Sequence, residues 1–275
     1  FRSDVKNGKL PTVSWLIAPE NFSDHPGAPW YGAWYISEVM DILTQNPDVW
    51  KKTIFILAYD ENEGYFDHVS PFVPAHPDQP ETGKTSKGID TRLEFVSAEQ
   101  ENKRPNKGRT GPIGLGFRVP LVIASPWSRG GYVCSEVFDH TSTLQFLEKF
   151  LSHKKGKNIE ETNISTWRRA VCGDLTSAFR PYKGEKIKLP TFVARDAFYE
   201  SIHKAQFKPV PSGYKAFSSD EIRQINQDPV ASANIPNQEK GMRPANALPY
   251  ELYADGRLVG NQFMLTMAAR NEVFA

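Results

Sequence analysis

The chain has 275 residues, of which 39% are hydrophobic and 12% aromatic, which is enough to bury one full domain core and more. Its 33 lysine and arginine residues nearly balance 32 aspartate and glutamate residues, so we expect no nucleic-acid partner and no general attraction to an anionic bilayer. No stretch approaches the roughly 20 apolar residues of a transmembrane segment, and residues 1–10 lack the apolar centre of a signal peptide.

The first elements along the chain are predicted to be a strand, a helix and a second strand. Residues 12–18 and 53–59 are short runs rich in apolar, β-branched and aromatic side chains, typical of strands covered on both faces. Apolar residues recur at helical spacing in residues 31–45, and Asn46-Pro47 is expected to end that helix. This order predicts a βαβ unit, in which a right-handed crossover makes the two strands parallel.

A third apolar run, residues 119–124, predicts another strand, and a helix is predicted after it over residues 142–151. Ser142 and Gln145 match a capping-box pattern, which places the start of this helix at Ser142. Together these elements predict an α/β fold with a mostly parallel sheet flanked by helices.

The other segments carry weaker patterns. Residues 69–117 show little periodicity and are predicted to be a long loop, either a lid or a surface excursion. Residues 181–247 are rich in proline, lysine and asparagine, which indicates a connector with one helix at residues 218–227. Alternating runs in residues 248–270, around Asp255-Gly256, predict a hairpin that opens an incomplete β domain.

The chain has two cysteines, Cys134 and Cys172, which are too few for a disulfide framework and lack the spacing of a zinc cluster. We expect two small buried side chains, and a single bridge between them is the alternative. Free cysteines are among the most frequently buried residues, which favours the first interpretation.

Polar clusters follow the three predicted strands, at residues 20–26, 60–68 and 125–131. In an open parallel sheet the reacting groups gather at the carboxyl ends of strands, so these clusters are candidate sites. The second is chemically the richest, because the adjacent carboxylates of Asp60 and Glu61 repel each other unless a cation compensates. Their oxygens suit magnesium, calcium, manganese or iron, although such an acidic loop can also be a solvated turn.

Histidines are further candidates. If the first two predicted strands are neighbours, His25 lies beside the acidic loop, where it could bind phosphate or protonate a leaving group; a structural role is the alternative. His68 and His140 each follow an aspartate and can equally orient loops or cap helices. No nucleophile is evident, because there is no Gly-x-Ser-x-Gly elbow and no strand-end serine or threonine beside a base.

Four long motifs resemble a known family. They are TVSWLIAPENFSDHPGAPWYGAWYI, TIFILAYDENEGYFDHV, VPLVIASPWSRGGYVCSEVFDHTSTLQFLE and NISTWRRAVCGDLTSAF, and they fall within residues 10–180. In this order they resemble the bacterial phosphocholine-specific phospholipase C family, which is related to an acid phosphatase family and to the alkaline-phosphatase-like fold. Residues 241–252 resemble the start of the β domains that follow the catalytic domain in this family.

The resemblance implies a domain organisation and a set of site residues. Residues 1–180 would be the carboxy-terminal half of a phosphoesterase catalytic domain, 181–247 an extended connector, and 248–275 the first strands of an incomplete β domain. Asp60 and Glu61 would bind a divalent metal ion, such as calcium, magnesium, manganese, iron or zinc. His25 would be the catalytic residue that contacts the substrate phosphate and serves the leaving group. The neighbours expected to shape the site are Asn62, Asp67, His68 and His140.

The resemblance also implies a reaction. A hydroxyl nucleophile would attack phosphorus, form a covalent phospho-enzyme and leave diacylglycerol and phosphocholine, with the metal lowering the nucleophile's pKa. The family's nucleophile and remaining metal ligands belong to an amino-terminal half absent from these 275 residues, so we expect the chain alone to be inactive. The expected substrate is a phospholipid headgroup at a membrane surface, and the family implies export to the periplasm or beyond.

Two other functions stay open. An acid phosphatase or another phosphodiesterase on the same fold would lack a choline pocket, whose candidate aromatic residues are Tyr31, Trp34, Tyr65 and Trp127. A non-catalytic lipid- or partner-binding module would use the carboxylate loop only structurally. Metal analysis separates this last function from the enzymes.

Overall fold

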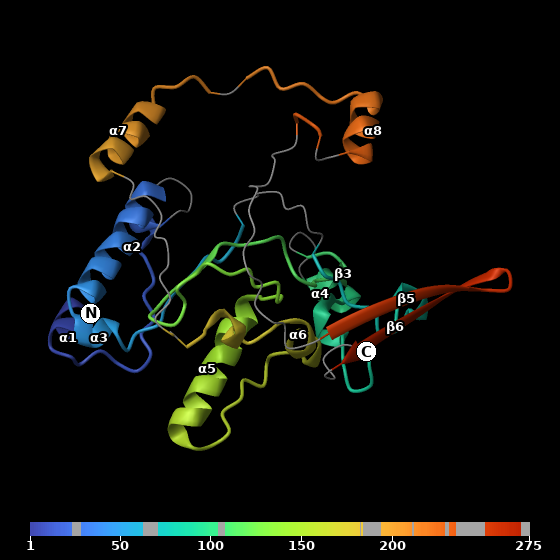
Figure 1. Cartoon of the computed structure of the whole chain (residues 1–275), viewed down its shortest axis with the longest axis horizontal. Helices are drawn as coiled ribbons and strands as arrows, with labels where there is room; N and C mark the ends of the chain where they lie inside the picture. The colour runs from blue at the N-terminus through green and yellow to red at the C-terminus, as the bar shows by residue number, and fades with distance from the viewer. Residues whose placement is uncertain are drawn as a thin grey trace. The chain divides into compact units, whose positions relative to one another are not determined.

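The computed structural model describes residues 1–23, 29–62, 71–103, 108–181, 183, 194–210, 212–228, 231–234 and 251–270 (Figure 1). The chain divides into one unit of residues 1–184 with 245–275 and a second unit of residues 185–244. Helices and short strands occur together, which confirms the mixed α/β class. In the described ranges, no helix is both long and apolar enough to cross a bilayer.

Helix α2 (Pro29–Thr44) confirms the helix predicted in residues 31–45. Its buried Val39 and Leu43 pack against Val5 of α1 (Arg2–Lys6). The helix ends before Asn46, whose side-chain oxygen accepts a hydrogen bond from Val49 N and so caps α3 (Pro47–Trp50). The Asn46 amide nitrogen also donates to Val5 O at 2.8 Å, so the residue predicted to end α2 joins α1 to α3.

Residues 12–18, predicted as the first strand, form no strand. Trp15, Leu16 and Ile17 are 66%, 40% and 86% exposed, and this segment belongs to none of the sheets in the described part of the chain. The predicted βαβ unit is therefore wrong for the described residues, because an apolar run specifies strand propensity but not a partner.

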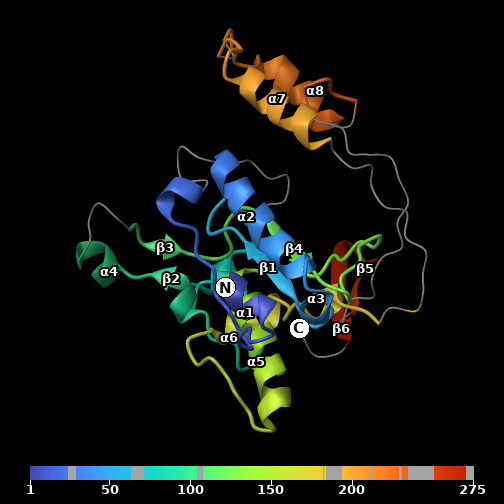
Figure 2. The ribbon, with the colours of Figure 1, turned by 90° about the vertical axis from the view of Figure 1, so that its left-hand side faces the viewer.

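The other two predicted strands are confirmed, as β1 (Phe55–Ala58) and β4 (Leu121–Ala124), which lie side by side in Figure 2. They pair antiparallel, with Phe55 opposite Ala124 and Ala58 opposite Leu121. Each sheet in the described part of the chain has two antiparallel strands, so the mostly parallel sheet is not found there. β4 begins beside Ala58, the last residue of β1, and therefore runs in the opposite direction. A parallel pair would need β4 to begin beside Phe55 instead.

The segment predicted as a long loop contains short elements where it is described. These are η2 (Pro80–Thr82), η3 (Arg92–Glu94), β2 (Phe95–Val96), α4 (Ala98–Lys103) and β3 (Gly111–Pro112), and β2 pairs with β3. Glu94 is only 3% exposed and forms an ion pair with Arg168 of α6 (Thr166–Val171). Periodicity failed to reveal these elements because each is shorter than the windows in which a pattern can be recognised.

Helix α5 (His140–Lys155) confirms the helix predicted at residues 142–151, but it starts earlier than predicted. Asp139 is the N-cap and Ser142 occupies the third helical position, where its hydroxyl accepts from Asp139 N at 3.0 Å. The predicted capping box of Ser142 and Gln145 is therefore wrong, and the true box of Asp139 and Ser142 lies three residues earlier. Aspartate caps a helix as well as serine does, so the sequence pattern allowed both positions. The helix ends at Gly156, whose φ of 63° lies in the left-handed region that glycine favours.

Arg169 of α6 joins that helix to the middle of α5. Its guanidinium donates to both carboxylate oxygens of Glu148, at 2.9 and 2.8 Å, and to the carbonyl of Glu161 at 2.7 Å. The hydrogen bond from Arg169 holds the pKa of Glu148 below its ordinary value of 4.5.

Acid is expected to destabilise the chain partly through Glu148. Because its pKa is lower in the folded than in the unfolded state, its contribution is fully present above about 4.5, the unfolded pKa, and is lost as the pH falls through the folded pKa. Urea unfolding between neutral pH and pH values below the folded pKa would measure this loss, which should be smaller in Glu148→Gln. An identical acid dependence in the two proteins would contradict the assignment.

Both cysteines are free. Cys172 is 3% exposed, as expected, whereas Cys134 is half-buried, with its sulfur 3.4 Å from Ser177 Oγ. Burial raises the pKa of the Cys172 thiol.

Iodoacetamide is therefore expected to label Cys134 in the folded chain and to spare Cys172, because the exposed thiolate is the reacting form. Peptide mass spectrometry measures the labelling, with the urea-unfolded chain as the control in which both cysteines react. Equal labelling in the folded chain would contradict the buried position of Cys172. Failure of both to react in the unreduced, unfolded chain would instead reveal a disulfide bridge.

The second unit contains α7 (Arg195–Ala205) and α8 (Ser219–Gln227). The latter confirms the helix predicted at residues 218–227, and Ser218 with Glu221 forms its capping box. Helix α7 was not predicted, and its N-cap, Ala194, makes no side-chain capping bond.

In the first unit, β5 (Glu251–Val259) and β6 (Gln262–Arg270) confirm the predicted hairpin but correct its turn. Val259 lies opposite Gln262, so Gly260-Asn261 forms the turn and Asp255-Gly256 lies within β5. Gly260 has a φ of 62°, as a two-residue hairpin turn requires.

Candidate functional site

The candidate site begins where β1 ends. Tyr59 N donates to Pro120 O at 3.3 Å and extends the β1–β4 ladder by one bond. Asp60 and Glu61 follow directly, both exposed, and Asn62 is half-buried. The two carboxylates therefore leave the sheet edge on a backbone that is fixed up to Tyr59.

His140 is brought to this loop from a position 81 residues further along the chain. It is the first residue of α5, and its Nε2 lies 2.9 Å from Tyr59 O. Because a carbonyl oxygen can only accept, Nε2 donates this bond, which requires a proton on that nitrogen. The ring thereby holds the peptide unit that immediately precedes Asp60.

Other predicted site residues lie outside the described residues: His25, Tyr65, Asp67 and His68. The described part of the first polar cluster forms η1 (Glu20–Phe22). Phe22 packs edge-on against Tyr31 and at a tilt against Trp34, with ring centroids 6.1 and 5.6 Å apart. These two candidate choline contacts therefore take part in local packing on α2.

The third polar cluster lies at the opposite edge of the sheet. Because β1 and β4 are antiparallel, the carboxyl end of β4 is beside Phe55 and not beside Asp60. Ser128 closes the turn after β4 by donating from its hydroxyl to Ile123 O at 3.0 Å. In the described chain no ring contact joins Trp127 to Tyr31 or Trp34, and the choline pocket stays a prediction.

Metal binding needs donors that converge. Across the described ranges, no three side chains of histidine, cysteine, aspartate or glutamate are grouped closely enough to hold an ion. Asp60 and Glu61 supply two adjacent hard oxygen donors, which fit one side of a divalent ion's coordination shell. A complete site needs further ligands beyond those described.

A buried charged cluster, which no sequence pattern predicted, surrounds Arg168. Its Nε and Nη2 donate to the two carboxylate oxygens of Glu94, at 3.0 and 2.8 Å, and its Nη1 donates to Asp139 Oδ2 at 2.6 Å. Burial works to lower the pKa of Arg168, but the hydrogen bonds to Glu94 and Asp139 outweigh it and raise the pKa. Arg168 lies in one of the quoted motifs, whereas Glu94 lies in the segment predicted to be a loop, so no local signal joined them.

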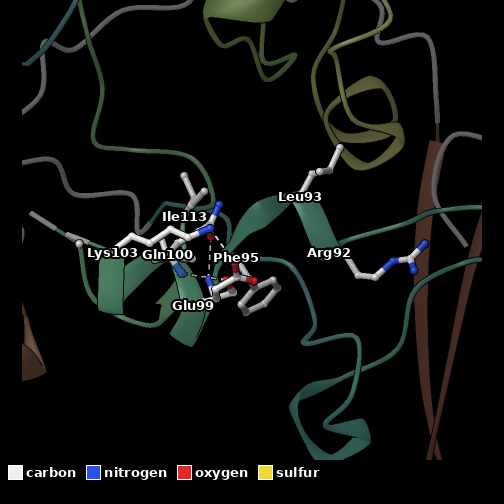
Figure 3. Close-up of a pocket in the computed structure, with 10 residues that line it drawn as sticks. Arg92, Leu93, Phe95, Glu99, Gln100, Lys103 and Ile113 are labelled. Atoms are coloured by element: carbon white, nitrogen blue, oxygen red, sulfur yellow. Dashed lines mark hydrogen bonds and ion pairs between the residues drawn. The ribbon is translucent and has the colours of Figure 1, made fainter. Parts of the chain in front are cut away.

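A shallow depression of about 550 Å³ lies among η3, β2, α4 and β3 (Figure 3). Apolar residues line it, including Phe95 and Ile113, and Figure 3 shows Lys103 reaching across to Glu99. Lys103 Nζ is 2.6 Å from Glu99 Oε1, and the Arg92 guanidinium pairs with Asp90. Because these cations are already paired with carboxylates, the depression is a weaker candidate for binding phosphate than the loop after β1.

Comparison with known proteins identifies relatives over most of the chain. The sequence model of the Phosphoesterase family matches residues 1–152. Non-hemolytic phospholipase C of Burkholderia pseudomallei is 42% identical over 271 residues, and that of Pseudomonas aeruginosa is 42% identical over 272 residues. Each alignment covers 98% of this chain and 35% of the relative. Hemolytic phospholipase C of Pseudomonas aeruginosa is 40% identical over 255 residues, which are 92% of this chain and 31% of the relative.

Proposed function

Because this chain belongs to the Phosphoesterase family, we propose that the full-length protein hydrolyses phosphatidylcholine-type lipids to diacylglycerol and phosphocholine. The observation that carries this proposal is the 40–42% identity to proteins named phospholipase C, which extends over 92–98% of the chain. The chain spans about a third of the length of these relatives, at 31–35%.

In this proposal Asp60 and Glu61 bind a divalent metal ion, and His25 contacts the substrate phosphate and serves the leaving group. A bound metal would supply positive charge that lowers the pKa of a nucleophile and neutralises the transferring phosphoryl group. The exposed carboxylates at a fixed strand end support the first assignment. The assignment of His25 rests on the Ser-Asp-His-Pro motif alone.

His140 has a different proposed role, because it contacts the backbone of the loop. By donating from Nε2 to Tyr59 O, it restricts the peptide unit that carries Asp60. A fixed backbone reduces the conformational freedom that the carboxylates lose when they bind a cation. His140 therefore acts in this proposal by holding the loop, with no transfer of its proton.

The rest of the reaction follows the same proposal. A hydroxyl nucleophile forms a covalent phospho-enzyme, and water then releases phosphocholine. The nucleophile and the remaining metal ligands belong to the amino-terminal half implied by the resemblance, so the 275-residue chain alone is expected to be inactive.

The exposed Trp15, Leu16 and Ile17 of this chain support packing against another part of the full-length protein. The alkaline-phosphatase-like fold of that protein and its export to the periplasm or beyond remain predictions.

The test compares substrates for the purified full-length protein. We expect hydrolysis of p-nitrophenylphosphorylcholine and of phosphatidylcholine vesicles, and little hydrolysis of p-nitrophenyl phosphate. Preference for p-nitrophenyl phosphate would favour an acid phosphatase. Absence of hydrolysis, together with vesicle binding, would favour a non-catalytic lipid-binding module. Full activity in a chelator, without a bound divalent ion, would contradict the metal assignment.

A further inference from the structure

Arg168 joins three segments that are far apart in the sequence. From α6 it donates to Glu94 at the end of η3, to Asp139 at the start of α5, and through Nη2 to Gly114 O at 2.8 Å. Ser165, the N-cap of α6, also donates from its hydroxyl to Glu94 Oε1 at 2.6 Å. One guanidinium thus fixes the relative positions of α6, η3 and α5.

These charged side chains are largely removed from water. The exposed fractions are 3% for the Glu94 side chain, 9% for Asp139 and 20% for Arg168. Burying charges is unfavourable unless the geometry is good and the remaining hydrogen-bonding groups are satisfied. Here both Glu94 oxygens accept hydrogen bonds, so the cluster has one well-defined arrangement. Such a cluster favours fixed geometry more than it favours stability.

Asp139 transmits this arrangement to α5, because its two oxygens have different partners. Oδ1 accepts from Thr141 N at 2.9 Å and from Ser142 N at 3.2 Å, and so fixes the first helical turn. Oδ2 accepts from Arg168 Nη1 and fixes that turn to α6. The next residue is His140, which contacts the peptide unit before Asp60.

We infer that Arg168 and Glu94 form a positioning unit for the Asp60–Glu61 loop, acting through Asp139 and His140. The effect of this unit on turnover rests on the proposed function, whereas its effect on the loop does not. The neighbouring pair of Arg169 and Glu148 provides a natural comparison. It is also bidentate and also joins α6 to α5, but it meets α5 eight residues after His140 and makes no described contact with β1.

The matched variants are Asp139→Asn and Glu148→Gln, made in the full-length protein. Each replaces a carboxylate that faces an arginine with an amide of the same shape. Asparagine caps a helix about as well as aspartate, so Asp139→Asn keeps the start of α5 and weakens the bond to Arg168. Glu148→Gln weakens the comparison pair in the same way. If Asp139→Asn does not fold, Arg168→Lys and Arg169→Lys replace the two variants, because lysine keeps the charge but loses the bidentate geometry.

The first readout is amide hydrogen exchange at Tyr59, which needs no substrate. Its N–H makes the last bond of the β1–β4 ladder before the loop, and its carbonyl accepts the hydrogen bond from His140. We expect loss of protection in Asp139→Asn and protection equal to wild type in Glu148→Gln. Equal protection of Tyr59 in the two variants would overturn the inference.

The second readout is steady-state hydrolysis of p-nitrophenylphosphorylcholine. Misplacing a site by a fraction of an ångström lowers kcat, so we expect a fall of about 10-fold to 100-fold in Asp139→Asn. KM should stay unchanged because none of these side chains is placed on the substrate, and Glu148→Gln should match wild type in both parameters. Unchanged kcat in Asp139→Asn, with an active wild type, would also overturn the inference. If the wild type is inactive and the Asp139→Asn variant still loses protection at Tyr59, the proposed function is refuted. The positioning unit is then still supported.

Discussion

Replacing Arg168 with methionine is expected to lower the free energy of unfolding of this chain by about 3–5 kcal/mol, the usual effect of breaking a buried ion pair. The physical reason is that Glu94, which is 3% exposed, would be left buried without its guanidinium partner. Asp139 would lose the same partner. Urea unfolding followed by circular dichroism measures the change.

Arg92→Met is the control for this prediction. Arg92 also makes a bidentate contact with a carboxylate, that of Asp90, but its side chain is 76% exposed and that of Asp90 is 44% exposed. Water screens exposed pairs, so Arg92→Met should unfold at the same urea concentration as wild type. Similar midpoints for Arg168→Met and Arg92→Met would show that burial does not strengthen the contacts of Arg168.

On the metal site proposed at Asp60 and Glu61, replacing Asp60 with asparagine is expected to lower turnover by the full-length protein about 100-fold or more and to remove the proposed divalent ion. Asparagine keeps the size of the side chain but removes the negative charge that makes a carboxylate a strong ligand for a hard cation. Hydrolysis of p-nitrophenylphosphorylcholine and elemental analysis of the purified protein measure the two effects separately.

Asp41→Asn is the matched control, because Asp41 is an exposed aspartate of α2 that lies outside all three polar clusters. It should retain both wild-type turnover and the metal content. An Asp60→Asn protein with normal metal content and normal turnover would contradict the role proposed for Asp60. Normal metal content with reduced turnover would show that Asp60 contributes without being a ligand.

Elements that depend on local signals could be predicted from the sequence. Helix α2 has a clear apolar stripe, and α8 begins with a serine followed three residues later by glutamate. Residues 53–59 and 119–124 contain β1 and β4, because short runs of this composition favour strands. Local signals failed where two candidate turns lay close together in the sequence. The hairpin turn was predicted at Asp255-Gly256, but it lies at Gly260-Asn261.

Pairings between distant residues could not be predicted in the same way. The composition of residues 53–59 contains nothing that selects β4 as a partner or sets an antiparallel direction. For the site, the acidic pair Asp60–Glu61 was evident because adjacent carboxylates after a strand are chemically unusual. The contact between His140 and Tyr59 spans 81 residues, and that between Arg168 and Glu94 spans 74, so only the folded chain reveals them.

The antiparallel pairing of β1 with β4 places the polar clusters that follow these two strands at opposite ends of the sheet. Phe55 lies opposite Ala124, the last residue of β4, and Asp60 is five residues further along, so about 16 Å of strand, at about 3.3 Å per residue, separates the acidic loop from the turn that begins at Ser125. Over such a distance, substitutions that share no partner usually change free energy additively. The turn after β4 can therefore accumulate changes without disturbing the acidic loop, and selection can act on the two motifs as separate modules.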